Sequence, residues 1–244
     1  MKFFPALLVL LTSVSSAQLF AVTAANGEAR DKTFDVLHYK IELSFNESKK
    51  MITGKTTITF VPFLPELRDA EFDAEDMSFS SVTMGKKSLT FDSLAKSIRV
   101  HLGRTYSFHD TVTVSFAYTS LPKRGAYFIQ PDSGYPNKPR QIWSQGEDMD
   151  NHHWFPCYDF PNDKATSEIT ATVKSNEVFL SNGRLVRTSK NKKAGTTTYH
   201  WKQDQPHASY LIMFAVGEYA ILTDSADGVP LEYYVYKNHL NDAR

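Results

Sequence analysis

Short segments of alternating polar and apolar residues recur along this chain. In residues 38–45 the two classes alternate with a period of two, as a half-buried β-strand requires. Residues 52–61 repeat the pattern with threonine and isoleucine, which suit a pleated surface. Further strands are predicted at 98–102, 111–118, 126–129, 141–144, 168–174, 178–181, 196–203, 210–216 and 231–236.

Turn signals separate these segments, and helical periodicity is weak. The pairs Asn182-Gly183, Ala194-Gly195 and Asp227-Gly228 favour turns between strands. Residues 89–95 are the best short helix candidate. Many strands at a spacing of roughly 8–12 residues predict an all-β fold, a mostly antiparallel sandwich or curved sheet. The proline-rich stretch 121–139 could be a linker, but we favour a functional surface loop within one domain.

Composition supports a folded core and gives no sign of a charged partner. Of the 244 residues, 41% are hydrophobic and 13% are aromatic, which is ample for a buried core. Lysine plus arginine and aspartate plus glutamate each number 27, so the net charge is zero. No basic bias indicates nucleic acid, and no polybasic run indicates a membrane surface.

The first residues have the pattern of a secretory signal peptide. Lys2 supplies positive charge, residues 3–11 are apolar, and small residues at 15–17 or 22–24 offer a cleavage site. We therefore expect a signal peptide in residues 1–25 and export to a periplasm or the medium. The alternative is a buried N-terminal strand. No later apolar run is long enough to span a membrane, so no span is expected after cleavage.

Residues 145–163 carry the most informative motif, Q-G-E-D-M-D-N-H-H-W-F-P-C-Y-D-F-P-N-D. This stretch resembles the N-terminal domain of the aminopeptidase N family of zinc metallopeptidases, to which leukotriene hydrolase also belongs. That family has a Gln-x-Glu or Gln-x-Gln pair, a Phe-Pro-Cys-x-Asp-x-Pro turn and then Lys-Ala at this place. Further blocks that resemble the family, in the same order, are residues 35–43, 53–58, 180–183, 206–212 and 214–219.

The resemblance implies a saddle-shaped, largely antiparallel β domain and a role for Gln145 and Glu147. In the family this pair helps to grip the free α-amine of a peptide substrate. An ammonium group has three N–H donors, so a carboxylate and an amide oxygen hold it well. In an extended segment both side chains point to the same side. The alternative is that both are solvated loop residues, and the family's usual Asp-Ala-Arg after the pair is replaced here by Asp148-Met149-Asp150.

The zinc chemistry of the family is absent from these residues. It needs H-E-x-x-H on a helix, and no histidine of this chain is followed by glutamate. The family's Gly-x-Met-Glu-Asn strand is missing too. We therefore expect Zn²⁺ only in the full-length parent, with none bound by this chain and no activity of the chain alone. The expected organisation is a signal peptide (1–25), a β domain (26–236) and the start of a connection (237–244) to a missing catalytic domain.

Other reactive residues have plainer interpretations. His152 and His153 could suggest a metal site, but neighbours on an extended segment point to opposite faces, which favours loop or surface histidines. Cys157 is the only cysteine, and a small buried hydrophobe is favoured over a catalytic thiol. Asp159 with Lys164 could be an acid and base pair, but Asp-x-Pro favours a structural turn.

Three alternative functions stay open from the sequence. The first is a stand-alone, non-catalytic exported β-sandwich that binds peptides or a partner. The second is a scaffold like the family's non-catalytic relatives in transcription complexes, against which the signal peptide argues. The third is a bifunctional aminopeptidase and epoxide hydrolase, a question that only the missing part could decide.

Overall fold

Strands form almost all of the regular structure. The computed structural model describes residues 31–243, so the expected signal peptide at 1–25 lies outside the described residues. All elements below belong to one unit that begins at Lys32. Within residues 31–243 the helical elements are three single-turn 3₁₀ helices: η1 (Asn151–His153), η2 (Ser209–Leu211) and η3 (Lys237–His239). The all-β prediction is confirmed, and no described helix has the length and apolar character to cross a membrane.

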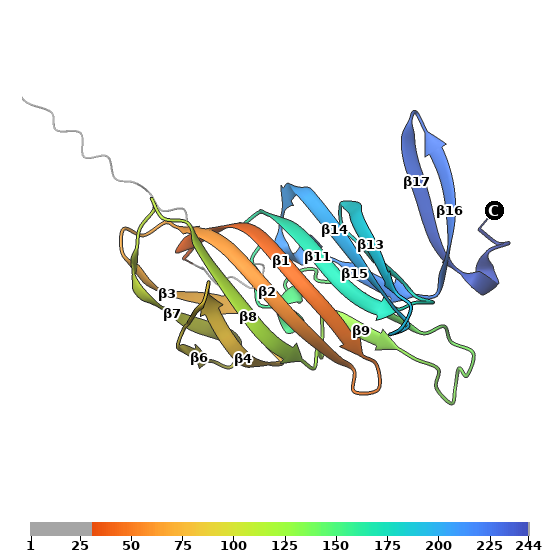
Figure 1. The fold of residues 1–244 in the computed structure, drawn as a ribbon, viewed down its shortest axis with the longest axis horizontal. Coiled ribbons are helices and arrows are strands. Elements are labelled where there is room, and N and C mark those ends of the chain that lie inside the picture. Colours follow the sequence, from red (N-terminus) through yellow and green to blue (C-terminus); the bar gives the residue numbers. More distant parts are fainter. Residues whose placement is uncertain (1–30, 244) are drawn as a thin grey trace, which may run out of the picture. The chain divides into compact units, whose positions relative to one another are not determined.

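An eight-stranded sheet is the largest element of the fold (Figure 1). Its strand order is β13-β14-β11-β1-β2-β8-β4-β5. Every neighbouring pair is antiparallel except β1 and β11, which run parallel. The strands are β1 (Phe34–Asn46), β2 (Met51–Pro62), β4 (Met77–Met84), β5 (Lys87–Ser88), β8 (Val112–Ser120), β11 (Ala165–Lys174), β13 (Arg184–Asn191) and β14 (Thr196–His207).

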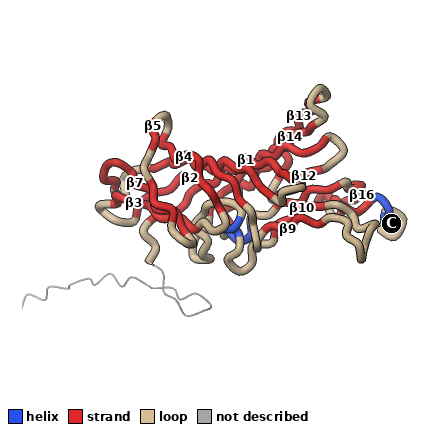
Figure 2. Tube along the Cα trace, turned by 90° about the horizontal axis from the view of Figure 1, so that it is seen from below, coloured by secondary structure: helices blue, strands red, loops and turns tan. Residues whose placement is uncertain are grey.

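Three smaller sheets complete the fold. They have the orders β12-β15-β10-β9, β3-β7-β6 and β16-β17. Figure 2 shows strand throughout these sheets, with helix confined to a few short turns. The strands are β3 (Leu67–Asp73), β6 (Phe91–Ser93), β7 (Ser97–Tyr106), β9 (Ala126–Ile129), β10 (Gln141–Ser144), β12 (Val178–Ser181), β15 (Phe214–Gly217), β16 (Tyr219–Ala226) and β17 (Val229–Tyr236).

A cluster of four buried phenylalanines packs the three-stranded sheet against the large one. Phe72 on β3 lies with its ring centroid 5.1 Å from Phe34, 5.6 Å from Phe60 and 5.3 Å from Phe116. The last three belong to β1, β2 and β8. These spacings and tilted geometries are those that aromatic rings prefer, so the cluster contributes packing energy beyond its buried area.

A second aromatic cluster joins the four-stranded sheet to β1 and to the motif at residues 145–163. The ring of Phe214 on β15 lies 5.3 Å from Phe45 on β1 and 6.1 Å from Phe179 on β12. Trp154, inside the motif, packs edge-on against Phe214 at 5.0 Å. The buried apolar residues of the motif therefore anchor it and fix where its polar residues emerge.

The best short helix candidate is not a helix, and one predicted strand begins late. Residues 89–95 form no helix, because Phe91–Ser93 pairs with β7 as strand β6. The strand predicted at 210–216 begins only at Phe214, since Ser209–Leu211 is a 3₁₀ turn. Strand β13 was not predicted because all eight of its residues are exposed and show no apolar alternation. It forms a strand because its backbone pairs antiparallel with β14.

Candidate functional site

The motif loop, defined here as residues 145–163, leaves the sheet at the end of β10. Its first residue is still held by the neighbouring chain, because the N–H of Gln145 donates to the carbonyl of Gly125 at 2.9 Å. The N–H of Asp150 then donates to the carbonyl of Gly146 at 2.8 Å and closes a turn. The chain is therefore extended only as far as Ser144 and reverses around Glu147.

Gln145 and Glu147 both present exposed side chains at the start of this loop. Neither side chain makes a hydrogen bond or ion pair within residues 31–243, so their polar atoms are available to a ligand. The Glu147–Asp148 peptide bond is cis. The prediction that the two side chains share one side assumed an extended segment, and the turn removes that assumption. Their role in amine binding stays a prediction.

Glycines allow the loop to approach its neighbours closely. Gly146 is buried, and a Cβ there would overlap the side chain of Asn151. Gly125 has a φ of +73°, and a Cβ there would overlap the carbonyl oxygen of Asp150. Both positions therefore require glycine for the loop to sit as it does.

Asn151 fastens the loop to the 3₁₀ turn before β15. Its side chain is fully buried and donates from Nδ2 to the carbonyls of Ser209 at 2.7 Å and Ile212 at 2.8 Å. Its Oδ1 accepts from the indole N–H of Trp154 at 2.7 Å. All polar atoms of this buried amide are engaged, which is the condition for burying it without a large penalty.

Asp159 has the structural role that its Asp-x-Pro context predicts. Its buried carboxylate accepts from the backbone N–H of His152 at 3.0 Å and from the hydroxyl of Ser209 at 3.0 Å. Lys164 is exposed, and no ion pair joins it to Asp159 in the described part of the chain. Cys157 is fully buried, as predicted for a small buried hydrophobe, and Trp154 and Phe155 beside it are fully buried too.

His152 and His153 do not lie as the sequence predicts. They occupy the 3₁₀ turn η1 and their rings stack, with centroids 4.5 Å apart and planes inclined by 30°. In a 3₁₀ turn consecutive side chains are about 120° apart, not on opposite faces as in a strand. The sequence predicts loop or surface histidines: both lie in the motif loop, but they are not surface residues, because the side chain of His153 is 6% exposed and that of His152 is 16% exposed.

Carboxylates surround this histidine pair. Nδ1 of His152 lies 2.9 Å from Asp159, and Nδ1 of His153 lies 2.9 Å from Asp76. Nε2 of His152 lies 3.7 Å from a carboxylate oxygen of Glu75. Burial alone would lower the pKa of His152, but the hydrogen bond to Asp159 and the nearby negative charges outweigh it, so the pKa is raised.

Glu75 and Asp76 were missed by sequence reasoning because they lie in the connection between β3 and β4, far from the motif in the chain. The backbones of Asp73 and Cys157 form an antiparallel bridge: the N–H of Asp73 donates to the carbonyl of Cys157 at 2.7 Å, and the N–H of Cys157 donates to the carbonyl of Asp73 at 3.1 Å. The N–H of Asp159 also donates to the carboxylate of Asp73 at 2.7 Å. These contacts bring the β3–β4 connection against the motif loop. No pattern in the sequence predicts that these two segments meet.

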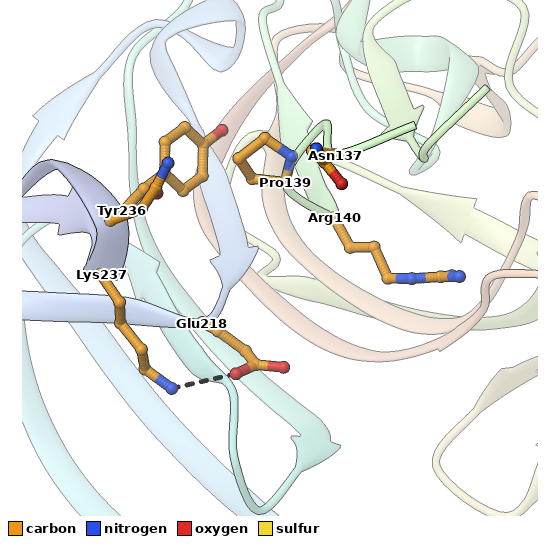
Figure 3. A pocket seen from close by; sticks show the side chains of 7 residues that line it. Asn137, Pro139, Arg140, Glu218, Tyr236 and Lys237 are labelled. Atoms are coloured by element: carbon orange, nitrogen blue, oxygen red, sulfur yellow. Dashed lines mark hydrogen bonds and ion pairs between the residues drawn. The ribbon is translucent and has the colours of Figure 1, made fainter. Parts of the chain in front are cut away.

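A surface pocket of about 440 Å³ lies elsewhere, at the start of the C-terminal segment (Figure 3). Glu218 and Lys237 form an ion pair of 2.9 Å on one side of it, and Arg140 lies on the other. Neither Gln145 nor Glu147 lines this pocket. The pocket and the predicted amine-binding pair are therefore separate features of the surface.

Comparison with known proteins identifies one family over most of the chain. Residues 36–211 match the family model described as the Peptidase M1 N-terminal domain. Aminopeptidase N from Lactobacillus helveticus is 30% identical over 217 residues, which are 85% of this chain and 24% of that protein. Transcription initiation factor TFIID subunit 2 from Danio rerio is 32% identical over 105 residues, 42% of this chain and 9% of that protein.

Solved structures show the same fold. The M1 zinc metallopeptidase from Deinococcus radiodurans superposes with a TM-score of 0.69 at 20% identity, covering 80% of this chain and 44% of that one. A two-domain M1 zinc metallopeptidase mutant bound to L-tryptophan gives a TM-score of 0.70 at 20% identity, covering 84% and 48%. The chain thus spans about a quarter of the Lactobacillus protein and under half of these structures. The resemblance inferred from the motif is confirmed.

The zinc named in these relatives has no catalytic counterpart among the residues of this chain. A catalytic zinc site of the H-E-x-x-H kind needs two histidines one helical turn apart with a glutamate beside the first. The sequence lacks that motif, and the described helices are single 3₁₀ turns. No hydrolytic step is therefore assigned to residues of this chain.

Proposed function

Since this chain belongs to the Peptidase M1 N-terminal domain family, we propose that it is the substrate-gripping domain of an exported zinc aminopeptidase that removes N-terminal residues from peptides. The observation that carries the proposal is the placement of Glu147. Its carboxylate is exposed and unpaired within residues 31–243, at the start of a loop whose later residues, from Asp150 on, are mostly buried. An exposed carboxylate on a fixed loop is suited to meeting an ammonium group.

The loop supplies the rigidity that recognition needs. Asn151, Trp154 and Asp159 are buried, and their hydrogen bonds run to Ser209, Ile212 and the loop itself. A carboxylate held on such a support loses little freedom when a substrate binds, so more of the interaction energy is expressed as affinity. Gln145, hydrogen-bonded through its backbone to Gly125, would present the second acceptor.

The rest of the enzyme lies outside these residues in this proposal. The relatives extend well beyond the matched region, and zinc would be held by residues of that further part. This chain alone is then inactive on peptides. Export is supported by the charge, apolar run and small residues of the N-terminal segment.

Replacement of Glu147 in the full-length protein tests the proposal. Glu147→Ala should lower kcat/KM for peptides with a free N-terminus. The expected loss of transition-state binding is about 2–5 kcal/mol, the range for removing one partner of a buried charge pair. The measurement is steady-state hydrolysis of an aminoacyl-nitroanilide and a short peptide. Asp148→Ala, which removes the adjacent exposed carboxylate, is the matched control and should retain near-normal kcat/KM. Equal values for wild type and Glu147→Ala would refute the amine-binding role.

The match to a TFIID subunit favours one second candidate, a domain that binds a partner without catalysis. This match covers less of the chain than the match to aminopeptidase N, 42% against 85%. The two candidates are distinguished by assaying the full-length protein with zinc present. Hydrolysis of free-amine peptides supports the aminopeptidase, and its absence in a folded, zinc-loaded protein supports the binding domain.

A further inference from the structure

We propose that Glu75, His152 and His153 form a second metal site, which takes one Zn²⁺ ion and fastens the motif loop to the β3–β4 connection. One donor atom from each of the three residues lies within 4.8 Å of the other two. Among residues 31–243 this is the one such group of three or more histidine, cysteine or acidic residues. It departs from the expectation that this chain binds no metal.

The donor spacing is close to that of a bound ion. Zinc holds imidazole nitrogen at about 2.0–2.1 Å and carboxylate oxygen at about 2.0–2.2 Å, so donors that share one ion stand about 3–4 Å apart. Nε2 of His152 and the Glu75 oxygen are already 3.7 Å apart. The third donor lies within 4.8 Å of both, so a side-chain movement of about 1 Å brings it into the same range. Two imidazoles and a carboxylate suit zinc, with water in the fourth position.

The outer contacts of both histidines are those of metal ligands. Each ring uses Nδ1 to meet a buried carboxylate, Asp159 for His152 and Asp76 for His153, at 2.9 Å in both cases. This arrangement fixes the ring and the tautomer, and it leaves Nε2 as the basic nitrogen. Metal-bound histidines in proteins almost always have such a partner on the other nitrogen.

A second histidine–glutamate group of this protein has a different charge balance. On the large sheet, Glu168 lies 2.7 Å from Nε2 of His200 and 3.7 Å from Nε2 of His38. There the ammonium of Lys40 lies 3.6 Å from the same carboxylate and supplies a positive charge. At Glu75 no lysine or arginine ion pair occurs in the described part of the chain. The ammonium of Lys123 pairs with the neighbouring Asp76 at 3.0 Å and acts on Glu75 only through longer-range charge, so a cation could still bind the Glu75 carboxylate directly.

Binding zinc would tie together two segments that are distant in the chain. Glu75 lies two residues after the end of β3, whereas the histidines occupy η1 within the motif loop. The ion would add to the backbone contacts between Asp73 and Cys157 and stiffen the loop that starts at Gln145. Ligands that bind only the folded protein raise its stability, so zinc should raise Tm.

Metal titration of the untagged 244-residue chain tests this site. The chain is stripped with a chelator, then titrated with zinc chloride by isothermal calorimetry, and Tm is measured with and without zinc. We expect one zinc per chain and a higher Tm with zinc. Glu75→Gln and His152→Ala should weaken binding at least as much as loss of an outer contact does, about 10–100-fold. His200→Ala removes a histidine paired with a glutamate elsewhere and should bind as wild type does.

Several results would overturn the site. They are no heat of zinc binding to the wild-type chain, equal affinity in Glu75→Gln, or an equal loss in His200→Ala. Glu75 is partly exposed, so Glu75→Gln keeps the test decisive if a histidine variant fails to fold. Absorption of the cobalt-substituted wild-type chain is the second measurement. A visible band typical of tetrahedral cobalt supports the site, and the spectrum of hexa-aquo cobalt contradicts it.

Discussion

The side chains of the motif loop fall into two groups: some are buried and hydrogen-bonded, and others are exposed and available to a ligand. Asn151, Trp154 and Asp159 are buried and hydrogen-bonded, while Gln145 and Glu147 are exposed. The division follows from the chemistry of each side chain, because a buried amide or carboxylate must find partners and an exposed one need not. The glycines at 125 and 146 help to hold the buried group in place, since each leaves space for a polar atom of the loop.

Substitution of Gly125 tests how tightly the loop is held. Gly125→Ala should lower the free energy of unfolding by about 3 kcal/mol or more, since it combines left-handed strain with an overlap against Asp150. Gly195→Ala is the matched control, because Gly195 has a similar φ of +65° but nothing within 4 Å of the added Cβ. The control should cost only about 1–2 kcal/mol. Urea unfolding measures both, and equal costs would show that the overlap with Asp150 is relieved without penalty.

At the scale of elements, cross-strand contacts explain how neighbouring strands are fixed in register. Glu168 on β11 pairs directly with Lys40 on β1 and with Lys202 on β14 in the backbone ladder. Its side chain reaches His200 on β14 and His38 on β1. Burial alone would raise the pKa of Glu168, but the hydrogen bond to His200 and the charge of Lys40 outweigh it and lower the pKa.

The lowered pKa of Glu168 predicts a pH-dependent contribution to stability. A carboxyl group with a depressed pKa stabilises the fold above its unfolded value of 4.5, and this contribution is lost as pH falls through the lower folded pKa. The difference in unfolding free energy between wild type and Glu168→Gln should be about 0.5–1 kcal/mol near neutral pH. It should shrink as the medium is made more acidic than the folded pKa.

Denaturant unfolding across the acid range measures this difference. Glu66→Gln is the control, because Glu66 is exposed and makes no ion pair within residues 31–243. For Glu66→Gln, the difference in unfolding free energy from wild type should not change as the pH falls. A gap for Glu168→Gln that stays constant or widens toward acid pH would contradict the assignment.

At the scale of the whole described unit, aromatic packing holds the sheets together. Phe72 contacts rings from three strands of the large sheet, and Phe214 joins β15 to β1, β12 and the motif loop. The motif loop lies between these clusters, through Trp154 on one side and the pairing of Cys157 with Asp73 on the other. Loosening either cluster should therefore affect the loop as well as the core.

Truncation of Phe72 measures how much the first cluster contributes. Its side chain is fully buried, so Phe72→Ala should cost about 3–5 kcal/mol of unfolding free energy. Phe108 is 55% exposed, and Phe108→Ala should change stability by no more than about 0.5 kcal/mol. Thermal and urea unfolding measure both variants. A cost for Phe72→Ala as small as that for Phe108→Ala would mean that the three-stranded sheet packs independently of the cluster.

The sequence by itself determined the fold class, most of the strands and the buried part of the motif. Strands such as β10 and β12 fall where alternation placed them, since period-two patterning directly reflects one buried and one exposed face. Trp154, Phe155 and Cys157 are buried as their residue types indicate. The motif also identified the family, and Glu147 as the residue to test.

Only the tertiary structure determined which distant segments of the chain contact one another. No local pattern indicates that β1 runs parallel to β11, or that Glu75 lies beside His152, because contacts between distant segments depend on how whole sheets pack. Local backbone changed the chemistry too, since a 3₁₀ turn in place of an extended segment stacked the two histidines on one another. Patterning reports which face of a segment is buried, and only packing determines which other segment buries it.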